Sequence, residues 1–262
     1  MDAPPLKPTE AIPPHPTLSG YYKTAADREP FVRALFDETA PWYESISAVL
    51  SFGSDNWYRR DALKRAGYGA GLKLLDVATG TGVVARAAAS LARSEDVIGL
   101  DPSLGMLLAG RHRNKTRAVQ AFGEHLPFRS ASFDLLSIGY ALRHMSDLRE
   151  AFAEHLRVLK PGGRVLILEI TPPSSKLGFA ALRTYMNGVV PPLVRLMTRK
   201  KDTATLMRYY WDTIAECVPP ESILSALREA GFEQVERQVR FGVMSEYRGM
   251  RPLSAARQDP AV

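Results

Sequence analysis

One twelve-residue stretch, Leu74 to Ala85, constrains the fold more than any other part of the chain. Its first four residues, Leu-Leu-Asp-Val, are typical of a strand that is buried on both faces of a sheet. The next five, Ala-Thr-Gly-Thr-Gly, form a turn of small side chains, in which glycine permits positive φ angles and close approach of a ligand. An alanine-rich helix follows, and its first N–H groups are free to bind. This order of strand, glycine turn and helix predicts a cradle for a nucleotide-type cofactor.

Strand and helix patterns continue to alternate after this stretch. Further strands are expected at 97–101, 118–122, 133–140, 164–170, 235–241 and 243–247. Such alternation predicts an α/β fold, with a doubly wound, Rossmann-like, seven-stranded and mostly parallel sheet covered by helices on both faces.

Two regions stand outside this alternation. Residues 1–27 begin with six prolines in the first sixteen positions, and we expect a disordered tail there. Residues 28–262 are expected to form a single domain, which starts with helices whose aromatic side chains either join the core or close over the cofactor. Within it, residues 171–212 are rich in proline, methionine and aromatic residues. This insertion is expected to be a helical lid over the substrate or a helical pair packed on the domain.

Composition and charge exclude several classes of protein. Cys217 is the single cysteine, which excludes an internal disulfide framework and fits a reducing compartment. No Cys/His cluster has metal-ligand spacing, and no apolar run approaches the roughly 20 residues that span a bilayer. Because no secretory signal is evident, a cytoplasmic location is expected. The net charge of +6 is spread along the chain, which argues against a nucleic-acid partner.

One local group of basic residues has two interpretations. Arg195, Arg199, Lys200 and Lys201 lie close together in the insertion. They form either an ordinary solvated face or a contact with an anionic membrane surface, which would suit a substrate with a lipid tail.

Ligands of parallel sheets bind outside the carboxyl ends of the strands. That rule gathers Asp76, Asp101, Phe122, residues 140–144 and Glu169 around one crevice. A carboxylate at the end of the second strand suits a ribose diol, because it accepts hydrogen bonds from two hydroxyl groups. The loop after Phe122 is expected to line a nucleotide base.

Several motifs together resemble the ubiquinone/menaquinone-biosynthesis C-methyltransferase family, within the class I S-adenosylmethionine-dependent methyltransferases. The resemblance runs from about residue 30 to about residue 250. The motifs are Ser51-Phe52-Gly53, Asp76 to Gly82, Leu126-Pro127-Phe128, Ser132-Phe133-Asp134, Ala141 to Asp147, Arg157 to Gly163, Leu168-Glu169 and Ala230-Gly231-Phe232. The Ser-Phe-Gly and Leu-Arg-x-x-x-Asp elements are the narrower ones, and they point to the quinone branch.

The resemblance implies S-adenosylmethionine as cofactor, with Asp101 on its ribose and the turn from Asp76 to Gly82 around its methionine part. It also implies that the last two strands lie antiparallel at one edge of the sheet. The cofactor-binding residues expected on these grounds are Tyr43, Asp76, Ala78, Thr79, Gly80, Gly82, Asp101, Pro102, Met106, Phe122, Gly123, Glu124 and Tyr140.

The catalytic residues expected are Arg143, which matches a family arginine, and His144. In methylation at a phenolic ring carbon, removal of the hydroxyl proton increases electron density on that carbon. A histidine is a natural base for this step, and an arginine stabilises the phenolate. His125 is the reserve candidate for the base. The residues expected to bind substrate are Glu169, Tyr185 and Tyr209, while Glu169 alternatively caps its loop.

The chain departs from the family pattern at three positions. Val83 and Phe122 stand where the family commonly has acidic residues, or Asn in the second case, and His144 replaces an asparagine. An aromatic ring at position 122 is able to stack on adenine in place of the polar contact.

The sequence therefore predicts a class I methyltransferase that methylates a small aromatic or quinol-like molecule, at a ring carbon. O- or N-methylation of a secondary metabolite on the same scaffold is the first alternative. Gly80-x-Gly82-x-x-Ala85 followed by Asp101 also matches the loose dinucleotide pattern of NAD-dependent oxidoreductases. A cofactor-binding module without catalysis is the remaining alternative. Peripheral membrane contact and a homodimer are both compatible with the sequence.

Overall fold

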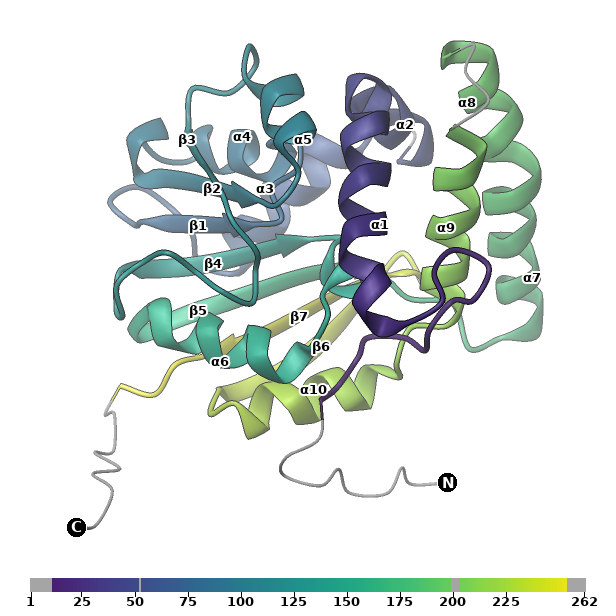
Figure 1. Ribbon diagram of the computed structural model, residues 1–262. Helices are drawn as coiled ribbons and strands as arrows, with labels where there is room; N and C mark the ends of the chain where they lie inside the picture. The colour runs from purple at the N-terminus through teal and green to yellow at the C-terminus, as the bar shows by residue number, and fades with distance from the viewer. Residues whose placement is uncertain (1–10, 52, 199–202, 254–262) are drawn as a thin grey trace.

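A central sheet of seven strands organises the computed structural model, which describes residues 11–51, 53–198 and 203–253 (Figure 1). The strands are β1 (Leu74–Val77), β2 (Val97–Asp101), β3 (Arg117–Gln120), β4 (Phe133–Gly139), β5 (Leu159–Ile170), β6 (Glu233–Arg240) and β7 (Met244–Met250). Their order across the sheet is β3-β2-β1-β4-β5-β7-β6. The first five strands are parallel, and β7 runs antiparallel to both of its neighbours. The predicted fold class is confirmed.

The two faces of the sheet carry separate cores, because successive side chains of a strand point to opposite faces. Along β1, Leu75 and Val77 join a core with Phe152 and Leu227, whereas Leu74 joins another with Leu63. The first face is covered by α6 (Leu148–Val158) and α10 (Pro220–Glu229), and the second by α3 (Asp55–Arg65) and α4 (Val83–Ala89). The remaining short elements of the α/β part are η2 (Ser94–Asp96), α5 (Leu104–Gly110) and η3 (Leu142–His144).

A third, purely helical layer combines the N-terminal helices with the predicted insertion. Its elements are α1 (Ala25–Thr39), η1 (Ala40–Trp42), α2 (Tyr43–Leu50), α7 (Lys176–Thr184), η4 (Tyr185–Val189), α8 (Val190–Thr198) and α9 (Thr203–Ala215). They share a core that includes Ile46, Met186, Leu206 and Tyr209. In Figure 1, α1 passes between the sheet and α9. The insertion is therefore helical as expected. Of the predicted basic group, Arg199, Lys200 and Lys201 lie outside the described residues.

Residues 11–24 correct the expected N-terminal tail. The side chain of Ile12 is only 5% exposed and belongs to the core below α6. Its amide donates to the Asp147 carboxylate over 2.9 Å, and its carbonyl accepts the Leu148 amide at 2.9 Å. The carbonyl of Pro14 likewise accepts the Val218 amide. The prediction of a tail through residue 27 is wrong for residues 11–27, because prolines lack N–H donors but keep carbonyls that neighbouring elements bind. Residues 1–10 of that tail lie outside the described residues.

The start of β5 corrects a second prediction. The sequence pattern predicts a strand that starts at residue 164. The strand instead begins at Leu159, which pairs with Phe133, and the register shifts before Leu135 pairs with Arg164.

Among the described residues, no helix has the length and apolar character needed to cross a membrane.

Candidate functional site

A cavity of about 340 Å³ opens at the carboxyl ends of β1, β2 and β4, where the topology predicts a ligand. We call it the large cavity. Ten of the thirteen residues that were expected to bind the cofactor line it: Tyr43, Ala78, Gly80, Asp101, Pro102, Met106, Phe122, Gly123, Glu124 and Tyr140. The rule that ligands bind at the carboxyl ends of parallel strands thus located most of these residues around the large cavity.

The other three, Asp76, Thr79 and Gly82, lie behind the turn rather than on the cavity wall. The carboxylate of Asp76 is fully buried and accepts hydrogen bonds from Thr79 Oγ1 at 2.6 Å and Ser137 Oγ at 2.7 Å. Burial raises its pKa to about 6 despite these two bonds. Gly82 begins α4 at φ 81°, and an added Cβ would come within 2.1 Å of the Asn114 side chain. These residues therefore shape the turn from beneath.

Asp101 is held rigidly at the end of β2. Its two carboxylate oxygens accept the amides of Gly80 at 2.7 Å and Ser103 at 2.8 Å. The side chain is 7% exposed and lines the large cavity. Burial raises its pKa to about 6, although both amide bonds oppose this shift. Since each oxygen of a carboxylate has more than one lone pair, Asp101 retains acceptor capacity for a diol.

Two residues of the cavity wall have strained backbones. Ala78 follows β1 with φ 53°, and Tyr140 follows β4 with φ 62°. Side chains other than glycine rarely adopt this left-handed region, and such strain gathers at functional sites. Both strained residues directly follow a strand and line the wall of the large cavity.

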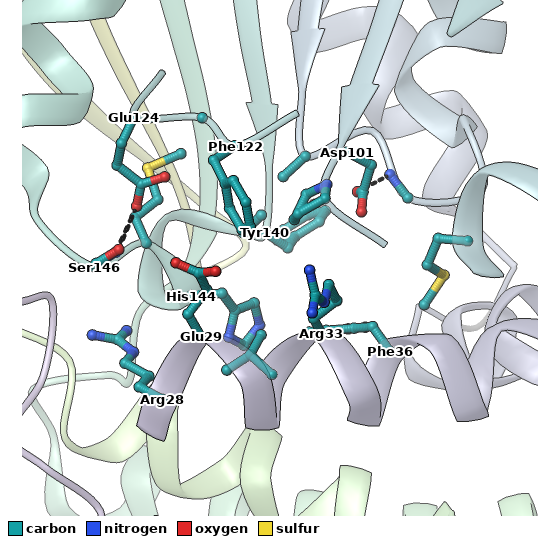
Figure 2. A pocket seen from close by; sticks show the side chains of 18 of the residues that line it. Arg28, Glu29, Arg33, Phe36, Asp101, Phe122, Glu124, Tyr140, His144 and Ser146 are labelled. Carbon is teal, nitrogen blue, oxygen red and sulfur yellow. Dashed lines mark hydrogen bonds between the residues drawn. The ribbon is translucent and has the colours of Figure 1, made fainter. Parts of the chain in front are cut away.

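Helix α1 supplies the wall opposite the strand ends. Figure 2 shows Arg28, Glu29, Arg33 and Phe36 of α1 facing the cavity from the side opposite Asp101, Phe122 and Tyr140. Arg28 is buried, and its guanidinium donates to the Arg143 carbonyl at 2.7 Å. Helix α1 therefore closes one side of the large cavity.

Sequence reasoning missed the polar residues of α1. The expectation for the N-terminal helices concerned their aromatic side chains alone. The spacing of residues 25, 29, 32 and 36 would have marked one helical face. That spacing alone does not reveal which neighbour the face covers.

A second, smaller cavity of about 60 Å³ adjoins the first. Tyr43 and Tyr140 line both cavities and therefore form the boundary between them. The small cavity also contains Arg143, which is 3% exposed and forms an ion pair with Glu169. Burial opposes the charge of Arg143, but the neighbouring carboxylate holds its pKa above the usual value. Its guanidinium also stacks on the ring of Tyr210.

His144 lines the large cavity instead of the small one. Its ring packs against Phe36 with centroids 5.1 Å apart and stacks on Tyr209 at 5.5 Å. Both ring nitrogens are buried and have no hydrogen-bond partner among the described residues. Burial, followed by the charges of Arg143 and Arg28, holds the pKa of His144 well below its ordinary value. The imidazole is therefore neutral at pH 7.

The three residues expected to bind substrate line neither cavity. Glu169 is 1% exposed and pairs with Arg143. The Tyr185 hydroxyl donates to the carbonyl of Val49 at 3.0 Å, and the ring of Tyr209 lies behind His144. Their contacts position other residues of the site. The reserve histidine, His125, is exposed and pairs with Glu150.

The residues around the large cavity fit the cofactor that the resemblance implies. Asp101 offers a buried carboxylate for a ribose diol, and Phe122 offers an aromatic face for adenine. The rings of Tyr43 and Tyr140 suit a sulfonium cation. The turn at Ala78 and Gly80 presents backbone rather than bulky side chains to this space. Among the described residues, no three His, Cys, Asp or Glu side chains are grouped as a metal site would need.

Comparison with known proteins extends these observations. Residues 23–251 match the model of the ubiE/COQ5 methyltransferase family. A demethylmenaquinone methyltransferase of Clavibacter sepedonicus is 36% identical over 226 residues, which cover 84% of this chain and 90% of that protein. A ubiquinone/menaquinone biosynthesis C-methyltransferase of Geobacter sulfurreducens is 32% identical over 231 residues, covering 85% and 89%.

Solved structures share the fold. An S-adenosylmethionine-dependent methyltransferase from Thermotoga maritima superposes with a TM-score of 0.58 at 19% identity, covering 83% of this chain and 99% of that one. The [4+2]-cyclase SpnF superposes with a TM-score of 0.61 at 18% identity, covering 86% and 97%. These distant likenesses concern the fold alone.

Proposed function

The chain belongs to the ubiE/COQ5 methyltransferase family and is an S-adenosylmethionine-dependent methyltransferase, and from this premise we propose that it methylates a ring carbon of a small quinol-like acceptor. The names of its relatives support a quinol acceptor, since one is a demethylmenaquinone methyltransferase and another a ubiquinone/menaquinone biosynthesis C-methyltransferase.

One observation carries the proposal: two cavities meet at Tyr43 and Tyr140, and each has a different chemical character. The large cavity holds the diol acceptor Asp101, which suits the cofactor. The small cavity is mostly apolar but contains the buried guanidinium of Arg143. An aromatic ring in the small cavity would therefore present one edge to the cofactor and an oxygen to Arg143. Such placement removes the entropic cost of aligning donor and acceptor.

When bound, S-adenosylmethionine supplies an activated methyl group, whose bonding electron pair stays on sulfur as S-adenosylhomocysteine forms. The acceptor loses a hydroxyl proton, and its ring electrons form the new carbon–methyl bond. The ring carbon then loses its hydrogen as a proton, which restores the aromatic ring. Arg143 stabilises the negative charge on the phenolic oxygen, and the buried helices around it exclude water.

His144 is proposed to accept the hydroxyl proton through a water at the boundary between the cavities, because its ring does not line the small cavity itself. Its neutral imidazole has two uncommitted nitrogens among the described residues and lines the large cavity. The nearby charges of Arg143 and Arg28 disfavour its protonated form, so it is a weak base. Its contribution to the rate is expected at the low end of general-base catalysis, about 100-fold.

The decisive experiment identifies the methylated atom. Purified protein is incubated with trideuteromethyl S-adenosylmethionine and 1,4-dihydroxynaphthalene under anaerobic conditions, and the product is analysed by mass spectrometry and NMR. A carbon-bound trideuteromethyl group supports the proposal. An ether product would instead establish O-methylation. Absence of any product, with S-adenosylhomocysteine bound tightly, would contradict a quinol acceptor.

We also propose peripheral contact with an anionic membrane through the outer helices α7 and α8 (Figure 1). Leu177 and Leu196 are 84% and 76% exposed, and the basic residues Arg183 and Arg195 are exposed on the same two helices. Exposed apolar and basic residues together suit an anionic lipid surface. Flotation with phosphatidylglycerol vesicles should be stronger than with phosphatidylcholine vesicles, and Leu177→Ser with Leu196→Ser should abolish it. Equal flotation with both vesicles would contradict the contact.

The expected homodimer stays a prediction, which light scattering would test.

A further inference from the structure

The small cavity contains a second buried cation that sequence reasoning did not single out. Arg59 of α3 is 6% exposed and lines this cavity together with Arg143. The two arginines come from α3 and η3, which are far apart in the sequence. A buried ion pair contributes little net stability because desolvation offsets the attraction, so two buried arginines in one small cavity are not explained by stability alone.

Each guanidinium is held in place from two sides. Arg59 pairs with Asp55 through Nε at 2.5 Å and Nη2 at 3.0 Å, and it stacks on the ring of Tyr140 at 4.7 Å. Arg143 pairs with Glu169 and stacks on the ring of Tyr210 at 5.4 Å. Two preformed and charge-balanced arginine forks therefore face the same cavity.

The second terminal nitrogen of Arg59 lies at the boundary between the cavities. The bonds to Asp55 use Nε and Nη2, which leaves Nη1 outside that pair. A Cβ added at Gly139 would come within 2.8 Å of Nη1. Gly139 lines the large cavity, and Tyr140 beside it lines both. Glycine at this position thus gives Nη1 the room to sit beside the point where the two cavities meet.

Besides the two arginines, Asp55, Ser47, Ser51 and three tyrosines, the lining of the small cavity is apolar. Ile46, Leu50 and Ile170 contribute aliphatic walls, and Met186 and Met244 contribute flexible ones. Met186 belongs to η4, a π-helical turn, and such turns often occur at functional sites. Methionine side chains adapt to ligands of irregular shape. This lining suits an aromatic ring and hydrocarbon substituents on it.

We infer that the small cavity binds the acceptor ring, and that Arg59 binds a second ring oxygen while Arg143 binds the first. This inference rests on the proposed function and deepens it: Arg59 recognises the second oxygen of the quinol, so that acceptors with two ring oxygens bind more tightly than acceptors with one. A guanidinium donates strong, charge-assisted hydrogen bonds to a phenolic oxygen. The Asp55 carboxylate balances the charge of Arg59, so that this cation does not repel a sulfonium in the large cavity.

The test compares two soluble acceptors that differ in one oxygen, 1,4-dihydroxynaphthalene and 1-naphthol. The KM of the first and the inhibition constant of the second are measured for the wild type, Arg59→Gln and Arg60→Gln. Arg60 is the next residue of α3 and is exposed, which makes it the matched control. The wild type and Arg60→Gln should prefer the dihydroxy compound by about 10-fold or more. Arg59→Gln should reduce that preference to less than about 2-fold.

A merely structural role of Arg59 predicts a different result. In that case Arg59→Gln would lower the melting temperature and leave the preference of the folded enzyme unchanged. The affinity for S-adenosylhomocysteine, measured by calorimetry, should stay unchanged in Arg59→Gln and reports on the integrity of the large cavity.

The wild type alone also tests the inference, even if Arg59→Gln does not fold. Equal affinity of the wild type for the two compounds would overturn it. The proposed function fails separately, if the wild type binds S-adenosylhomocysteine but forms no carbon-methylated product from 1,4-dihydroxynaphthalene.

Discussion

Arg143 and His144 are neighbours in the sequence, yet their side chains line different cavities. Arg143 faces the small cavity and pairs with Glu169, whereas His144 faces the large cavity and stacks on Tyr209. Both residues belong to the short 3-10 turn η3, in which successive side chains point about 120° apart. The turn therefore directs the two side chains into different cavities, and their proposed roles are separable by mutation.

Removing Arg143 should abolish turnover and also destabilise the protein. Arg143→Met leaves the carboxylate of Glu169 buried without its cation, which should cost about 3–5 kcal/mol of unfolding free energy. In the double variant Arg143→Met with Glu169→Gln, stability should recover to within about 1–2 kcal/mol of the wild type, while turnover stays lost. Urea unfolding and methyl-transfer assays measure the two effects. Recovery of turnover in the double variant would show that Arg143 is only a structural partner.

Replacing His144 should slow the reaction without weakening cofactor binding. His144→Gln keeps a polar side chain but removes the base, and kcat should fall by about 100-fold. The dissociation constant of S-adenosylhomocysteine should stay within about 3-fold of the wild type, since His144 contributes only ring packing to the cavity wall. A kcat within 2-fold of the wild type would exclude the base role, and His125→Gln serves as the exposed control.

The gathering of the expected cofactor residues around one cavity was predictable because strand ends follow a simple geometric rule. Asp101 ends β2, Tyr140 directly follows β4 and Phe122 lies two residues after β3, and parallel strands deliver their carboxyl ends to one edge. This rule does not predict which of the expected residues line the cavity and which support the turn from behind. Asp76 points to the same sheet face as Ser137, and that cross-strand neighbour binds its carboxylate.

Residues outside the α/β alternation were harder to place for a physical reason. Arg28 and Arg59 make contacts with elements far apart in the sequence, Arg28 with the Arg143 carbonyl and Arg59 with the ring of Tyr140. The proline-rich segment around Ile12 was misread because composition reports the lack of helix propensity and not the availability of Asp147 as a partner. Packing between elements far apart in the sequence determined the positions of the two arginines and of the segment around Ile12.

Removing the Asp101 carboxylate should weaken cofactor binding specifically. Asp101→Ala should reduce the affinity for S-adenosylhomocysteine by about 10- to 100-fold, since a carboxylate that binds ribose hydroxyl groups contributes about 1.5–3 kcal/mol. Calorimetric titration measures this change, and the exposed Glu95→Ala is a charge-matched control. Unchanged affinity in Asp101→Ala would refute the ribose assignment.

Cofactor affinity should also depend on pH near 6. Burial raises the pKa values of Asp76 and Asp101 to about 6, so both carboxyl groups are ionised at pH 7.5 and become protonated as the pH falls through 6. A protonated Asp101 has lost acceptor strength toward the ribose, and affinity should fall on the acidic side. Asp101→Asn should start from weaker binding at pH 7.5 and show a smaller dependence. A wild-type affinity that is constant from pH 5 to pH 7.5 would contradict this role of Asp101.

The stability of the fold should depend on the segment before α1. Ile12 is 5% exposed in the core beneath α6, and truncation of such a residue to alanine removes contacts that the core cannot fully replace. Ile12→Ala should lower the unfolding free energy by about 2–4 kcal/mol, because its packing also holds the backbone bonds to Asp147 and Leu148 in place. Thr17→Ala changes an exposed residue of the same segment and should shift stability by less than about 0.5 kcal/mol. Urea midpoints at equal m-values measure both variants. Equal midpoints would mean that residues 11–24 lie on the surface of the domain without stabilising it.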